Sequence, residues 1–134
     1  MNWVSAEPEL FNNLFRHIEQ SPLKGKVTAI VDGVRKDLTT PYIVIGETDI
    51  IESVGSQSMT EDIAVQMHVY ADNKPLCREL KKDLKHYAKQ YFPLEHYEIK
   101  KIRLSNEQVM TDIDQYTSHG VLRLVYTVSH AVAF

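Results

Sequence analysis

The chain has 134 residues, of which 43% are hydrophobic and 25% are charged, and its formal net charge is −3. This length suits a single domain with one core, taken here as residues 1–134. The 15 basic and 18 acidic side chains nearly balance, whereas a dedicated nucleic-acid-binding protein usually carries a strong basic excess. The single cysteine excludes an intrachain disulfide, so we expect a protein made in a reducing compartment.

The first half of the chain reads as one helix and three strands. Helical spacing of apolar residues predicts a helix in EPELFNNLFRHIEQSP, residues 7–22. Strands follow at 26–31 and 41–47, and the four apolar residues in a row within PYIVIGE are typical of a strand covered on both faces. The clearest strand lies in EDIAVQMHVYAD, residues 61–72. Its apolar face comprises Ile63, Val65, Met67 and Val69, and its other face comprises Ala64, Gln66, His68 and Tyr70.

The second half reads as a helix followed by two long strands. The helix is predicted in NKPLCRELKKDLKHYAKQYF, residues 73–92, with a buried stripe made of Leu76, Leu80, Leu84, Ala88 and Tyr91. The strands are expected within 95–110 and from about 116 to 130, and the last one has a face made of Leu122, Leu124, Tyr126 and Val128. The order helix–β–β–β–helix–β–β predicts an α+β fold, in which two helices pack on one face of a mainly antiparallel sheet.

Motifs of catalysis and cofactor binding are missing, so we expect no enzyme, no cofactor and no catalytic or metal-binding residues. The glycines are too widely spaced for a phosphate-binding loop, and one cysteine with six scattered histidines makes no zinc motif. The spacing of Asp112 and Asp114 would suit a divalent cation, but a plain acidic turn is the favoured interpretation. Cys77 is interpreted as a small hydrophobic residue, and His68 and His119 as structural residues.

Two basic runs are interpreted as solvated surface. Lys81, Lys82, Lys85 and Lys89 occupy the predicted helix face opposite the leucines, with acidic residues between them. The run EIKKIRL, which carries Lys100, Lys101 and Arg103, is interpreted in the same way. A surface that stacks on nucleic-acid bases would require aromatic residues among the basic ones, and neither run contains them in that arrangement.

The strongest candidate for a functional segment is TDIIESVGSQSMT, residues 48–60, expected as a loop longer than a usual hairpin connection. One interpretation is that Ile50 and Ile51 simply extend the core. The other is an adaptable arm whose apolar residues become buried only on a partner, at up to about 1.5–3 kcal/mol for each large side chain. The partner-binding residues predicted for this arm are Glu47, Thr48, Asp49, Ile50, Ile51, Glu52, Val54, Gly55 and Met59.

The order of several features is similar to that of a known family. PYIVIGE (41–47) is followed by a loop, an alternating strand that includes 65–71, an amphipathic helix and the strand start GVLR (120–123). Together these features, spread over about residues 6–131, resemble the tail-completion, or tail-to-head joining, proteins of long-tailed bacteriophages, in particular those of Bacillus siphophages. Tyr70 stands where this family often has tryptophan.

The resemblance implies a structural virion protein, made in the host cytoplasm as a monomer, that assembles at the head–tail interface as a ring, expected to be hexameric. One side of the ring would bind the tail-tube protein and the other the head-completion protein of the connector. DNA would only pass through the channel, and no membrane is involved. The alternative function is a small cytoplasmic adaptor or regulatory binding module without catalysis.

Overall fold

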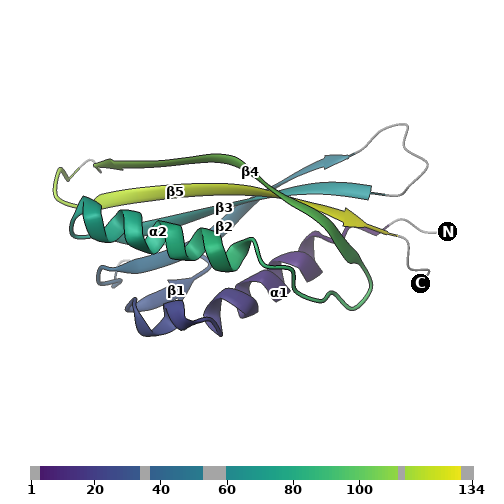
Figure 1. The fold of residues 1–134 in the computed structure, drawn as a ribbon, viewed down its shortest axis with the longest axis horizontal. Helices are drawn as coiled ribbons and strands as arrows, with labels where there is room; N and C mark the ends of the chain where they lie inside the picture. The colour runs from purple at the N-terminus through teal and green to yellow at the C-terminus, as the bar shows by residue number, and fades with distance from the viewer. Residues whose placement is uncertain (1–3, 34–36, 53–59, 112–113, 131–134) are drawn as a thin grey trace.

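Two helices lie on one face of a five-stranded sheet (Figure 1). The structure, a computed structural model, describes residues 4–33, 37–52, 60–111 and 114–130. In chain order the elements are α1 (Glu7–Glu19), the 3-10 turn η1 (Pro22–Gly25), β1 (Ala29–Val31), β2 (Tyr42–Glu52), β3 (Thr60–Ala71), α2 (Lys74–Ala88), β4 (Glu98–Thr111) and β5 (Ser118–Ser129). The predicted α+β fold and its element order are confirmed.

The sheet has the strand order β1-β2-β3-β5-β4. Every neighbouring pair is antiparallel except β1 with β2, which is parallel. The two central strands, β3 and β5, pair along their whole length, from Thr60 opposite Ser129 to Ala71 opposite Ser118. Helix α2 carries the chain from β3 past the position of β5, so that β4 forms one edge of the sheet and β1 the other.

The core lies between the helices and the inward-facing residues of the sheet. In β3 and β5 these are the two apolar faces predicted from the sequence, and all their residues are fully buried: Ile63, Val65, Met67, Val69, Leu122, Leu124, Tyr126 and Val128. The helices contribute Leu10, Leu14, Ile18, Leu80, Leu84 and Ala88. The one polar atom that Tyr126 brings into this core is satisfied, because its hydroxyl donates to the Ala88 carbonyl oxygen at 2.7 Å.

Predictions about two of these elements have different outcomes. In the strand at 41–47, expected to be covered on both faces, consecutive residues Ile43, Val44 and Ile45 are all buried, although both described helices lie on the same face of the sheet. The predicted end of the second helix is wrong. Helix α2 ends at Ala88 instead of continuing to residue 92. Phe92 packs into the core where Tyr91 was expected to do so, and Tyr91 is 61% exposed. Pro93 follows at once and cannot continue a helix.

A buried carboxylate ties both ends of the described chain to the sheet. Glu61 faces inward near the start of β3 and is 0% exposed. It accepts hydrogen bonds from Ser5 Oγ at 2.5 Å and from the Ala6 backbone N–H at 2.8 Å, and it lies 2.9 Å from His130 Nε2. Ala6 is the residue before α1 and provides no side-chain cap, so the carboxylate places its negative charge at the helix N-terminus.

Replacing Glu61 tests this cluster. We expect Glu61→Ala to lower the free energy of unfolding by about 3 kcal/mol, because it leaves the Ala6 N–H and His130 buried without their acceptor. Glu61→Gln keeps the size and one acceptor oxygen, so its loss should be smaller, about 1 kcal/mol. Urea denaturation followed by circular dichroism measures both. An alanine variant as stable as the wild type would contradict this role.

Candidate functional site

Strand β2 contains a bulge where the sequence suggested that it ends. Its register with β3 shifts between Gly46 and Thr48, so Glu47 is an extra residue. Glu47 has a φ of 53°, in the left-handed region that residues other than glycine seldom adopt. At Gly46 a Cβ atom would lie 3.2 Å from the backbone oxygen of Asp32, which favours glycine there. The prediction of a loop from Thr48 is wrong, because pairing resumes after the bulge and β2 continues to Glu52.

The predicted arm is therefore largely a strand. Six of the nine residues proposed to bind a partner lie in β2: Glu47, Thr48, Asp49, Ile50, Ile51 and Glu52. The other three, Val54, Gly55 and Met59, lie outside the described residues. Ile50 is opposite the buried Ile63 but is itself 45% exposed, so it does not extend the core. Figure 1 shows why, since the ends of β2 and β3 project past the last turn of α2.

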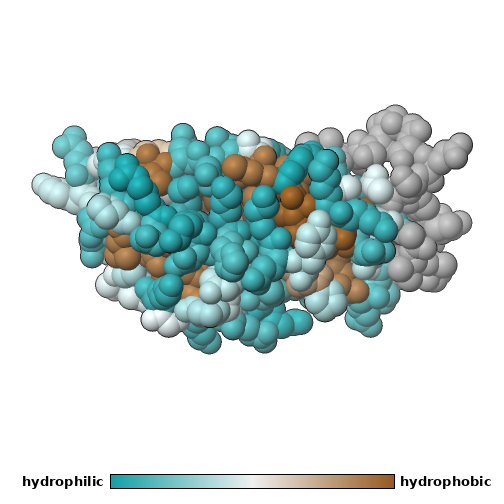
Figure 2. Space-filling view, viewed as in Figure 1, coloured by the Kyte–Doolittle hydropathy of each residue, from teal (hydrophilic) through white to brown (hydrophobic). Residues whose placement is uncertain are grey.

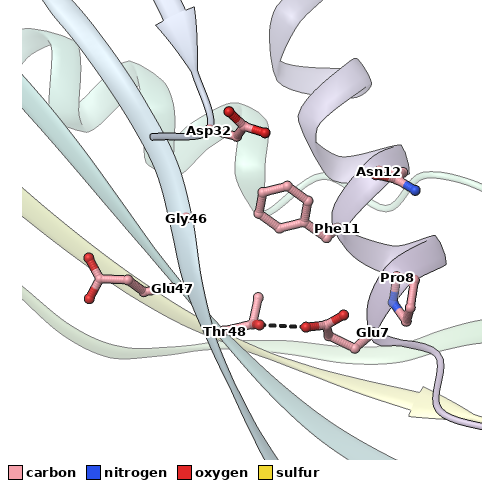
Figure 3. Close-up of a pocket in the computed structure, with 8 residues that line it drawn as sticks. All are labelled: Glu7, Pro8, Phe11, Asn12, Asp32, Gly46, Glu47 and Thr48. Atoms are coloured by element: carbon pink, nitrogen blue, oxygen red, sulfur yellow. Dashed lines mark hydrogen bonds between the residues drawn. The ribbon is translucent and has the colours of Figure 1, made fainter. Parts of the chain in front are cut away.

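An open hollow of about 390 Å³ lies between the bend of β2 and the first turns of α1 (Figure 3). Thr48 joins its two sides, since its hydroxyl donates to Glu7 Oε2 at 2.7 Å. Phe11 forms part of the wall, and Glu7, Asp32 and Glu47 line the hollow; the carboxylates of Glu7 and Asp32 lie on its side of β2, whereas the Glu47 carboxylate points away from it toward His68. Its charge suits a cationic side chain. In the ranges that the structure describes, no three His, Cys, Asp or Glu residues gather as metal ligands would.

On the opposite face of the sheet, histidines connect the bulge to the neighbouring strands. His68 Nδ1 lies 2.9 Å from His119 Nε2, and His68 Nε2 lies 3.3 Å from a carboxylate oxygen of Glu47. Tyr70 stacks on His119 on one side, with ring centroids 4.3 Å apart, and on Tyr42 on the other, at 4.8 Å. This row crosses β2, β3 and β5, which fits the interpretation of both histidines as structural residues.

Cys77 and Asp114 also have structural contacts. Cys77 is fully buried, and burial raises the pKa of its thiol, which disfavours the reactive thiolate. The Asp114 carboxylate accepts hydrogen bonds from the Thr117 hydroxyl at 2.6 Å and from the backbone N–H groups of Thr117 and Tyr116 at 2.8 and 2.9 Å. These bonds lower the pKa of Asp114 and close the turn before β5. Asp112, considered with it as a cation ligand, lies outside the described residues.

None of the described helices is long and apolar enough to cross a membrane. Figure 2 shows hydrophilic residues over much of the face seen in Figure 1, with smaller hydrophobic areas between them.

Comparison with known proteins gives one relative with a described role. No family model matches the chain. In an alignment of 136 positions the chain is 27% identical to tail completion protein gp17 of Bacillus phage SPP1, over 97% of this chain and 99% of the relative. The solved structure of SPP1 gp17 matches this one with a TM-score of 0.63 at 25% identity, and the match covers 98% of this chain and 96% of the gp17 chain. The resemblance to phage tail completion proteins is confirmed.

A second solved structure has the same fold. It is a chain in the virion of a native gene transfer agent particle. The match has a TM-score of 0.81 and covers 95% of this chain and 99% of that chain. The identity is 10%, so this likeness establishes the fold alone.

The bulge can be tested by changing Glu47. Because glycine adopts a positive φ freely, we expect the Glu47→Gly variant to be at least as stable as the wild type. The substitution removes about 1 kcal/mol of backbone strain, which offsets the loss of the contact with His68. Glu47→Val places a β-branched residue in the same conformation and should lower the free energy of unfolding by about 1–2 kcal/mol. Thermal denaturation compares the two. Equal destabilisation would mean that the side-chain contact matters more than the backbone conformation.

Proposed function

We propose that this protein is a structural virion protein that joins the phage tail tube to the head connector, without catalysis. The observation that carries this proposal is the similarity to a tail completion protein over 97% of this chain and 99% of the relative. The match thus extends over nearly the full length of both sequences. A chain in the virion of a gene transfer agent particle shares this fold, which is compatible with a place in a particle, and we propose the head–tail interface as that place.

The shape of the subunit suits a protein that contacts two partners. The β2–β3 hairpin and the turn between β4 and β5 lie at opposite ends of the elongated sheet (Figure 1). Each end exposes an apolar residue, Ile50 at 45% and Tyr116 at 84%. We propose that the monomers assemble as a hexameric ring whose two sides meet the tail-tube protein and the head-completion protein. DNA then passes through the ring, and the balanced charge of the chain avoids holding it tightly.

The β2–β3 hairpin is proposed as one of these two contacts, with the nine residues named above as its partner-binding residues. Its end lies beyond α2, so its own chain leaves Ile50 exposed. Burial of such a side chain against a partner contributes up to about 1.5–3 kcal/mol. The hairpin therefore has a physical reason to bind a protein surface.

Electron microscopy of purified protein mixed with isolated tail tubes and with DNA-filled heads tests the joining role. We expect rings at one end of the tubes, and tubes with rings should then attach to heads. If a folded protein leaves both tubes and heads bare, the joining function is wrong and the adaptor function replaces it.

A substitution at Ile50 tests the hairpin. We expect Ile50→Ser to reduce the attachment of heads to tails by about tenfold or more, because it removes an apolar contact of 1.4 kcal/mol or above. The melting temperature should change little, since the side chain is exposed in the free protein. Ile50→Val is the matched control, because it keeps an apolar β-branched residue in the strand and should retain attachment. Equal attachment by both variants would contradict the hairpin contact.

A further inference from the structure

Charge is divided between the elements near the two edges of the sheet. Helix α2 and strand β4 together contain eight Lys and Arg residues and four Asp and Glu residues. Helix α1 and strand β2 contain one Arg and six Asp and Glu residues. Strand β4 is one edge of the sheet, with α2 packed against β3, β5 and β4, whereas β2 and α1 pack together near the other edge. The subunit is therefore basic on one side and acidic on the other.

The basic side has a continuous row of exposed cations along α2. We call Lys74, Arg78, Lys82 and Lys89 the basic surface, since they recur at spacings that share one helix face. Lys82 lies 2.8 Å from Glu79. Within the described part of the chain, the other three make no ion pair.

Two further lysines of α2 share one carboxylate of β4. Lys81 and Lys85 lie 3.1 and 3.3 Å from the carboxylate oxygens of Glu107 on β4. Burial would raise the pKa of Glu107, but the hydrogen bonds and charges of both lysines outweigh burial and lower it. Glu107 is thus ionised yet neutralises only one of its two neighbours, so the excess of positive charge persists along α2.

The acidic side contains the hollow described above. We call Glu7, Asp32 and Glu47 the acidic surface, because they surround the bend of β2: Glu7 and Asp32 lie on the side of the hollow, and the carboxylate of Glu47 lies on the other side. Asp32 and Glu47 are exposed, and the partly buried Phe11 forms its apolar wall. A hollow with acidic edges and an aromatic wall fits a lysine or arginine side chain. The aliphatic stem packs on the ring, and the cation reaches the carboxylates.

We propose that the basic surface of one copy docks on the acidic surface of the next copy, an inference that rests on the proposed ring. A two-fold contact would bring each surface against itself and so would oppose like charges. Two different and complementary surfaces instead repeat head to tail, which is the type of contact that builds a ring when the rotation between copies closes. It also leaves both ends of the sheet, with Ile50 and Tyr116, available for other partners.

Charge reversal on one side at a time tests this contact. The first variant combines Lys74→Glu, Arg78→Glu and Lys82→Glu, three exposed positions on α2, and changes the formal charge of the basic surface from +4 to −2. Lys74 lies in the first turn, where negative charge stabilises a helix. The second variant combines Asp32→Lys with Glu47→Lys. Each variant carries two surfaces of one sign and should form rings on tail tubes about tenfold less often than the wild type. The control variant combines Lys24→Glu with Glu95→Lys, two exposed positions outside both surfaces, and should form rings normally.

Mixing the two reversed variants gives the sharper test. One variant has only acidic and the other only basic surfaces, so their mixture should restore rings in which the two alternate. If each variant alone forms rings as the wild type does, the proposed contact is wrong and the joining function stands. If the wild type leaves the tubes bare, the joining function fails instead. Sedimentation of the mixture at low ionic strength then tests the contact independently of the tail tubes. A complex that neither variant forms alone would support the contact, and a mixture that sediments only as monomers would overturn it.

Discussion

The pairing of β3 with β5 in one register is the constraint on which the rest of the fold depends. The described helices cover one face of the sheet only, and these central strands turn their large apolar side chains toward it, whereas the other face carries Gln66, His68 and Arg123 together with Ala64, Val121 and Val125. A slip of one residue would move Gln66 and His68 beneath the helices and expose the apolar face. Strands β2 and β4 add to the two outer sides of this pair, and both helices pack on its apolar face.

The bulge in β2 shows how one residue changes what the sheet presents. Without the extra residue, alternation from Ile45 would turn Thr48 and Ile50 toward the uncovered face. With it, Thr48 turns inward and reaches Glu7 on α1, while Glu47 lies beside His68 on the other face. The hollow and its carboxylates thus follow from a local backbone conformation. The same conformation keeps the hairpin paired beyond the helices, where Ile50 is exposed.

The features that could be predicted from the sequence are those that produce a regular spacing of apolar residues. The features that were missed depend on contacts between residues far apart in the sequence. The alternation in β3 and β5 identified the core faces directly. A glycine followed by glutamate reads as the end of a strand, so the bulge was missed. Glu61 looks like one of several polar residues at a strand entrance, and only the folded chain brings Ser5, Ala6 and His130 to it. The interpretation of the α2 lysines as solvated surface holds for Lys82, but Lys81 is only 14% exposed and pairs with Glu107, because β4 lies beside α2 in the folded chain.

The edges of the sheet give a reason for contacts between copies to use side chains. Strand β1 is only three residues long and offers little backbone to a neighbouring strand. Strand β4 is long, but its register shifts twice against β5, and it carries Lys100, Lys101 and Arg103. Short strands, bulges and lysines are the features that oppose edge-to-edge pairing of sheets. A contact made by exposed charges is reversible, because each exposed ion pair is individually weak. Such a subunit can remain a monomer until a partner gathers several copies in one place, which is the behaviour that joining a tail to a head requires.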